Sequence, residues 1–214
     1  MHLSGVHLPR GRFTDALVAL SAFVLLFVGV VVGFQAAALS FGFLPLEFSS
    51  GAWQGDALRS GLSPLASAFL PIDPISAIFN LIFLLIAGRY VERAIGPTGL
   101  GITFLVACYC GAAGRLIFTP QSPIPSAGLD SALFGVIGSY FMLYGVPATL
   151  PISRRFGRVG QIAILALIWI GIQLVFALTA GSFDPSTSVV APVFGLVAGI
   201  ALARPLLAWR YRGA

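Results

Sequence analysis

Residues 88–96 read Gly-Arg-Tyr-Val-Glu-Arg-Ala-Ile-Gly, so that Glu92 stands four residues after Gly88 and four before Gly96. On an α-helix this spacing puts the three residues on one face. Glycines on a helix face let a second helix approach closely, and a carboxylate at membrane depth needs a hydrogen-bond donor. The segment therefore predicts a helix packed against a neighbour, with Glu92 bonded to that helix or to its loop.

The composition around this segment is that of a protein that crosses a membrane several times. Of 214 residues, 58% are hydrophobic and only 9% are charged, and the mean hydropathy is +0.99. Soluble domains carry charge on about a quarter of their residues, and disordered chains combine low hydrophobicity with high charge. The strands of a membrane β-barrel alternate apolar and polar residues, which this chain does not do. We therefore expect one all-α membrane domain over residues 1–214.

Several apolar stretches are long enough to be transmembrane helices, each of which needs about 20 apolar residues. Six spans are predicted, over about residues 16–39, 75–95, 100–118, 131–150, 159–180 and 189–209. Residues 42–74 form a long first loop, in which polar residues are mixed with apolar segments too short to span. We expect this loop to lie in the membrane interface.

The arginines are distributed unevenly between the two sides that six spans create. If both termini are cytoplasmic, only Arg59 and Arg115 lie on the outer side. Positive residues concentrate in cytoplasmic loops, so this distribution predicts cytoplasmic N- and C-termini. It also accounts for the net charge of +5 without a nucleic-acid partner. We expect an integral, multi-pass protein of the bacterial inner (plasma) membrane.

Two strongly polar residues fall at or near membrane depth and need a physical reason there. Asn80 lies in the span predicted over 75–95, where it either bonds a neighbouring helix or faces a wet cavity. Asp130 follows Gly128 and begins the span predicted over 131–150. A carboxylate at that place is typical of an N-cap or first-turn residue, which meets the positive end of the helix dipole.

Small residues at four-residue spacing mark two further helix contacts. Ser131, Gly135 and Ser139 form one stripe, and Gly195 and Gly199 form a second. Stripes of this kind allow helix backbones to approach closely in a membrane. We expect both stripes to be packing surfaces. Cys108 and Cys110 lie two residues apart, which points them in different directions on a helix, so we expect packing residues and no metal pair.

Together these motifs resemble, over about residues 58–203, the rhomboid family of intramembrane serine proteases. The segments that carry the resemblance are Ser76–Asn80 (family H-x-x-x-N), Gly88–Gly96 (G-x-x-x-E-x-x-x-G), Cys110–Gly114 (a small-residue stretch), Gly128–Gly135 (G-x-S-G) and Pro192–Gly199 (H-x-x-G-x-x-x-G). The resemblance implies a six-transmembrane-helix rhomboid-like bundle with a long first loop.

The residues at the family's catalytic positions differ from the family pattern. The resemblance places Asp130 at the nucleophilic serine, Pro192 at the basic histidine, and Ser76 at the histidine that helps bind the oxyanion. Of the family's site residues, Asn80, which also helps bind the oxyanion, is the one kept. These positions, together with the neighbouring Ser131, form a degenerate site.

Ser131 is a poor substitute for the missing serine. One step along a helix turns a side chain by about 100°, and a serine hydroxyl needs a neighbouring base to become a nucleophile. The sequence has no lysine, and its two histidines, His2 and His7, lie in the N-terminal tail. We therefore expect no catalytic residue.

The expected function is that of a rhomboid-like pseudoprotease. It would hold a transmembrane helix of another membrane protein, as a scaffold, an assembly factor or a stable subunit of a larger membrane complex. The alternative is a rhomboid-family intramembrane serine endopeptidase with atypical or residual activity. The chain shows no internal repeat of the kind found in transporters. It also has no phosphate-binding glycine loop and no His/Cys ligand group, so we expect no cofactor and no metal.

Overall fold

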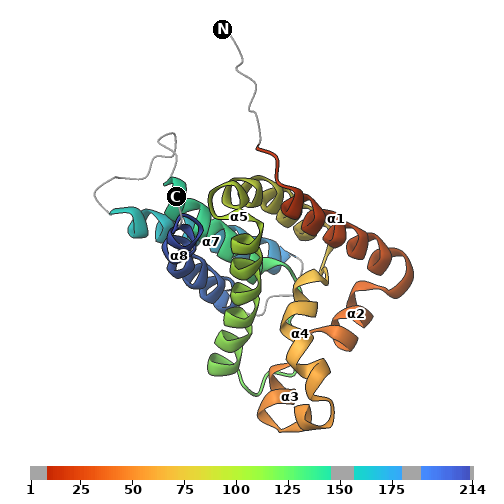
Figure 1. Cartoon of the computed structure of the whole chain (residues 1–214). Helices are drawn as coiled ribbons and strands as arrows, with labels where there is room; N and C mark the ends of the chain where they lie inside the picture. Colours follow the sequence, from red (N-terminus) through yellow and green to blue (C-terminus); the bar gives the residue numbers. More distant parts are fainter. Residues whose placement is uncertain (1–8, 146–156, 180–188, 213–214) are drawn as a thin grey trace.

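The computed structural model describes residues 9–145, 157–179 and 189–212, and these residues are almost entirely helical (Figure 1). A single isolated β-bridge, between Phe43 and Ser126, joins two loops of this part of the chain. The elements are α1 (Arg12–Phe27), a π-helical turn (Val28–Val32), α2 (Phe34–Phe41), α3 (Pro45–Ser49), a 3-10 turn (Ala52–Gly55), α4 (Ala57–Phe69), α5 (Pro74–Phe118), α6 (Asp130–Tyr144), α7 (Gly157–Thr179) and α8 (Ala191–Arg210).

Among the described residues, three helical stretches are long and apolar enough to cross a membrane: Arg12–Val32, Pro74–Phe118 and Ala191–Arg210. The protein is therefore an all-α protein with apolar, membrane-type helices. The expectations of six spans and of cytoplasmic termini remain predictions.

The long helix α5 consists of two arms that run in different directions (Figure 1). They meet at Gly96, whose φ of 81° and ψ of 169° leave the helical region. Glycine tolerates a positive φ without the steric cost that a side chain would bring, and the following Pro97 starts a new helix readily. We call residues 74–95 the first arm and residues 97–118 the second arm. They match the helices predicted over 75–95 and 100–118, but Gly96 forms the turn between them and is no longer part of the helix face.

The first predicted helix, 16–39, is wrong in its bounds. Helix α1 begins earlier, at Arg12, and the chain breaks after a π-helical turn at Gly33. Gly33 has a φ of 84°, and the separate short helix α2 follows it. A single glycine in an apolar run does not by itself predict such a break, because an isolated glycine is also tolerated inside helices.

The helix predicted over 131–150 is too long. Helix α6 starts at Asp130 and ends at Tyr144, because Gly145 takes a φ of 81° and its N–H bonds the carbonyl oxygen of Phe141. This is a common way for a helix to end. Residues 146–150 lie outside the described residues. The bounds of α7 and α8 differ from the predicted ones by only a few residues.

The loop predicted over 42–74 contains helices α3 and α4 with a 3-10 turn between them. Asp56 starts α4 by accepting a hydrogen bond from the backbone N–H of Arg59. The loop also holds the segment that leads into α6, since the N–H of Gly128 donates to the carbonyl oxygen of Ser67 at 2.9 Å. Residues 42–74 are therefore a folded helical unit packed against the rest of the protein.

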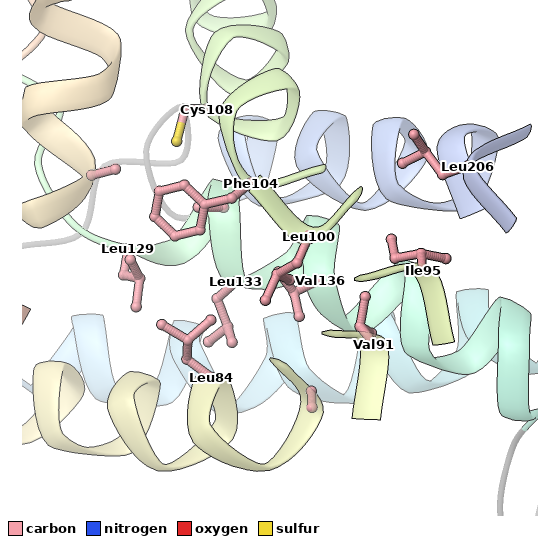
Figure 2. Packing of buried hydrophobic residues seen from close by; sticks show 13 residues of the cluster. Leu84, Val91, Ile95, Leu100, Phe104, Cys108, Leu129, Leu133, Val136 and Leu206 are labelled. Carbon is pink, nitrogen blue, oxygen red and sulfur yellow. The ribbon is translucent and has the colours of Figure 1, made fainter. Parts of the chain in front are cut away.

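The main core lies where both arms of α5 meet α6 and α8 (Figure 2). Its largest buried side chains are Leu84, Val91 and Ile95 from the first arm, Leu100 and Phe104 from the second arm, Leu133 and Val136 from α6, and Leu206 from α8. Because lipid tails are as apolar as leucine, close packing rather than removal from water holds such helices together.

Helices α6 and α8 pack through their small residues. A β-carbon added to Gly195 would collide with the backbone carbonyl of Ser131, and one added to Gly199 would collide with that of Gly135. The hydroxyl of Ser139 donates to the carbonyl oxygen of Gly199 at 2.8 Å. The two predicted stripes therefore face each other, with backbone against backbone.

Candidate functional site

The residues at the degenerate site come from the start of the first arm of α5 and from the starts of α6 and α8. Asp73 begins α5, because its carboxylate accepts the backbone N–H of Ser76 at 2.8 Å. Ser76 is partly exposed, whereas Asn80, one turn further along the same face, is only 4% exposed. The Asn80 side chain therefore points toward the protein interior.

Asn80 reaches across to α6. Its side-chain Nδ2 donates a hydrogen bond to Oδ1 of Asp130 at 3.0 Å. Of the two alternatives for Asn80, a bond to a neighbouring helix or exposure to a wet cavity, the structure shows the bond. A hydrogen bond to a charged group is among the stronger ones in proteins.

Asp130 is the first residue of α6, and the preceding Leu129 holds the N-cap position without a side-chain capping bond. Of the two alternatives for Asp130, N-cap or first turn, the structure shows the first turn. The carboxylate therefore lies near the positive end of the α6 dipole, and it bonds α5 through Asn80.

Ser131 points to a different neighbour. A β-carbon added to Gly111 in the second arm of α5 would lie 2.5 Å from Cβ of Ser131 and 3.0 Å from its hydroxyl oxygen. Its backbone carbonyl lies against Gly195 of α8. The side chains of these adjacent α6 residues thus contact different arms of α5, as the rotation of about 100° per residue allows.

Pro192 is the second residue of α8 and is buried. The missing N–H of a proline costs little at this place, because the first turn of a helix has no internal acceptor for it. The carbonyl oxygen of the preceding Ala191 would lie 3.2 Å from a β-carbon added to Gly111, the glycine that contacts Ser131. The starts of α6 and α8 therefore meet beside the second arm of α5.

The loop before α6 is held from within by Arg115, a role that sequence reasoning missed. Arg115 lies in the last turn of the second arm of α5 and is fully buried, with 0% exposure. Its Nη2 donates to the carbonyl oxygen of Ile124 at 3.1 Å. Phe43 and Ser126 exchange two backbone hydrogen bonds, of 3.0 and 2.7 Å, on the same loop. A lone arginine at the end of an apolar run was the available signal, but its partners lie in an irregular loop that no periodicity predicts.

The motif around Glu92 lies away from this site and holds α1 against the first arm of α5. The Glu92 carboxylate accepts the backbone N–H groups of Phe13 and Thr14, at 3.1 and 2.8 Å, and the Thr14 hydroxyl at 2.7 Å. A β-carbon added to Gly88 would lie 2.8 Å from Cγ2 of Thr14. Glu92 therefore satisfies the first N–H groups of α1, which have no partner inside that helix.

The described residues contain no group of three or more His, Cys, Asp or Glu side chains able to hold a metal ion. Cys108 is buried in the main core and Cys110 is partly buried, and neither forms a disulfide. The two histidines, His2 and His7, lie outside the described residues. What the site offers chemically is a carboxylate and an amide bonded to each other.

The sequence matches the family model described as the Rhomboid domain over residues 61–209. It is also similar to the Rhomboid protease GluP of Bacillus subtilis (strain 168), with 30% identity over 127 residues. That match covers 59% of this chain but 23% of the relative, so the chain spans about a quarter of that protein's length.

Proposed function

The chain belongs to the rhomboid family, and from that premise we propose that it is a non-catalytic member that binds a transmembrane helix of another membrane protein. The observation that carries the proposal is the hydrogen bond between Asn80 and Asp130. At the positions where the family has its nucleophile and an oxyanion donor, this chain has a carboxylate that engages the amide. An oxyanion hole needs a donor free to meet developing negative charge, and a fixed carboxylate supplies charge of the wrong sign.

The surface available to a partner helix lies on the first arm of α5. Four isoleucines at helical spacing are well exposed there: Ile75, Ile78, Ile82 and Ile86. Gly88 and Glu92 on another face contact α1. Phe83 packs edge-on against Trp169 of α7, with 4.6 Å between the ring centroids. The isoleucine stripe therefore has α1 and α7 as neighbours, and a partner helix packed on it would act through close apolar contact.

This proposal is tested by site-specific photo-crosslinking in the native membrane. A photoreactive residue placed at Ile78 or Ile82 should trap one defined membrane protein. The same residue at Phe23 of α1, which is 65% exposed, is the matched control and should trap none. Equal trapping of many proteins at all three positions would mean that the stripe only faces lipid, and would overturn the proposal.

The alternative, favoured by the name of the similar Bacillus protein, is an intramembrane serine protease with residual activity. The full chain reconstituted in vesicles with a panel of transmembrane substrates separates the two functions. Under our proposal no substrate is cut. Cleavage that disappears in Ser131→Ala would establish the alternative.

We further propose six transmembrane spans in the bacterial inner membrane, with both termini in the cytoplasm. The arginine distribution supports this arrangement. Single cysteines introduced at Arg59 and at Arg212, in a chain without Cys108 and Cys110, test it with an impermeant thiol reagent. Labelling of intact spheroplasts at position 59 but not at position 212 is expected, and the reverse pattern would overturn the orientation.

A further inference from the structure

Three helices end together at one end of the molecule. The first arm of α5 ends before Gly96, α6 ends at Tyr144, and α8 ends at Arg210. Nη1 of Arg210 donates to the carbonyl oxygens of Glu92 and Arg93, at 3.2 and 2.8 Å. Arg210 therefore caps the last turn of the first arm and offsets the partial negative charge of that helix end.

Tyrosines tie α6 to the same place. The hydroxyl of Tyr144 donates to the carbonyl oxygen of Tyr90 at 2.9 Å. Arg93 and Tyr211 each lie close enough to Tyr144 to act on it electrostatically. The guanidinium carbon of Arg210 is 5.7 Å from the ring centroid of Tyr211. We call Arg93, Tyr144, Arg210 and Tyr211 the arginine–tyrosine end.

The arginine–tyrosine end carries positive charge that no carboxylate of the described residues balances. The nearby ion pair joins Arg89 to Asp15, with 2.8 Å between Nη2 and Oδ1, and involves neither Arg93 nor Arg210. The nearby Glu92 carboxylate is turned away toward the N–H groups of α1. Within the described part of the chain, no hydrogen bond engages the exposed side chain of Arg93.

This positive end lies where a membrane-spanning helix finishes. Helix α8 is apolar enough to span a membrane. Trp209 in its last turn is 51% exposed, and Tyr211, directly after the helix, is 53% exposed. Exposed tryptophan and tyrosine at a span's end are typical of the level of the lipid headgroups. With α8 spanning a membrane, the guanidinium groups of Arg93 and Arg210 would reach the depth of lipid phosphates.

We propose that Arg93 and Arg210, with the hydroxyl of Tyr211, bind the phosphate of an anionic phospholipid at the arginine–tyrosine end. Planar guanidinium groups offer paired N–H donors that match phosphate oxygens. Arg210 commits Nη1 to helix carbonyls, which orients its remaining donors, while Arg93 has its whole side chain available. An anionic lipid fits better than a zwitterionic one because it leaves a negative charge to balance the arginines.

The test is a lipid titration of the purified full chain in mild detergent, followed by native mass spectrometry. Phosphatidylglycerol is the probe, phosphatidylcholine is the zwitterionic comparison, and inorganic phosphate is the soluble one. Arg93→Gln removes a charge whose side chain makes no hydrogen bond or ion pair within the described part of the chain. Arg204→Gln is the matched control, since Arg204 is an exposed arginine on α8 without a place in the arginine–tyrosine end.

The wild-type chain should retain one phosphatidylglycerol, and Arg93→Gln should bind it about fivefold more weakly, as expected for one interfacial arginine. Arg204→Gln should bind as the wild type does, and the melting temperatures of the three proteins should agree. Two outcomes would overturn the proposal. One is that phosphatidylcholine is retained as well as phosphatidylglycerol. The other is that Arg93→Gln and Arg204→Gln weaken phosphatidylglycerol binding equally, which would mean that the lipid responds only to the overall positive charge. Displacement of the lipid by inorganic phosphate would assign the site to a soluble anion instead.

Discussion

Nδ2 of Asn80 lies 3.0 Å from Oδ1 of Asp130, a residue that follows it fifty positions later in the chain. This bond joins the first arm of α5 to the first turn of α6. The resemblance to the rhomboid family assigns these two positions to an oxyanion donor and the nucleophile. In the structure the two residues hold two helices together.

If this bond contributes to stability, its two partners must be energetically coupled. Asn80→Ala and Asp130→Ala should each lower the free energy of unfolding, because each leaves the other group without this bond. The double variant should lose less than the sum of the two, by about 1–3 kcal/mol. Reversible unfolding in mixed micelles measures all four proteins. Strict additivity would show that the bond adds nothing.

The carboxylate of Glu92 should be essential for holding α1. It accepts hydrogen bonds from Phe13 and Thr14, and bonds to a charged group contribute about 1.5–3 kcal/mol each. Glu92→Ala should therefore destabilise the protein by about 3 kcal/mol or more. Glu92→Gln keeps one acceptor oxygen and should lose less. The melting temperature in detergent measures both.

The control for Glu92 is Glu47→Ala. The Glu47 carboxylate accepts the hydroxyl of Ser60, at 3.2 Å, and lies in the loop unit outside the main core. Its replacement should lower the melting temperature only slightly. A Glu47 effect as large as that of Glu92 would mean that the contact with α1 has no special weight.

Because α6 and α8 are in close contact, one methyl group added at Gly199 should strongly lower the stability of the protein. Gly199→Ala would push a β-carbon into the backbone of Gly135, which cannot rotate away. Overpacking of this kind costs about 1–3 kcal/mol, or more where backbone must move. The melting temperature should drop clearly. Gly171→Ala on α7 is the matched control, because a β-carbon there meets no atom within 4 Å.

A serine at position 130 and a histidine at position 192 should together create a reactive serine. A fluorophosphonate probe should not label the wild type or Asp130→Ser, since a serine without a base is a weak nucleophile. The double variant Asp130→Ser with Pro192→His should be labelled, because the starts of α6 and α8 meet beside Gly111. Labelling of the wild type that is lost in Ser131→Ala would contradict the non-catalytic proposal. An unlabelled double variant with an unchanged melting temperature would contradict the assignment of these two positions.

Much of the helical framework was readable because its signals are local. The apolar run over residues 75–95 predicted most of the first arm of α5. The spacing of small residues predicted a packing stripe on α6 and another on α8. The break at Gly33 and the early end of α6 at Gly145 were missed, because a glycine's φ is set by the surrounding packing as much as by its identity.

The sequence by itself determined the membrane class and most of the helix-forming segments, and it shows that the chain has no lysine and only two histidines, His2 and His7. These are properties of composition and of neighbours within one or two turns. Only the tertiary structure decided that Glu92 bonds α1, 78 residues away, and that Asn80 bonds Asp130 on α6. It also decided that Asp130 and Ser131 face different arms of α5. The physical reason is that the direction of a side chain depends on helix rotation and on partners distant in the chain, which leave no local pattern to read.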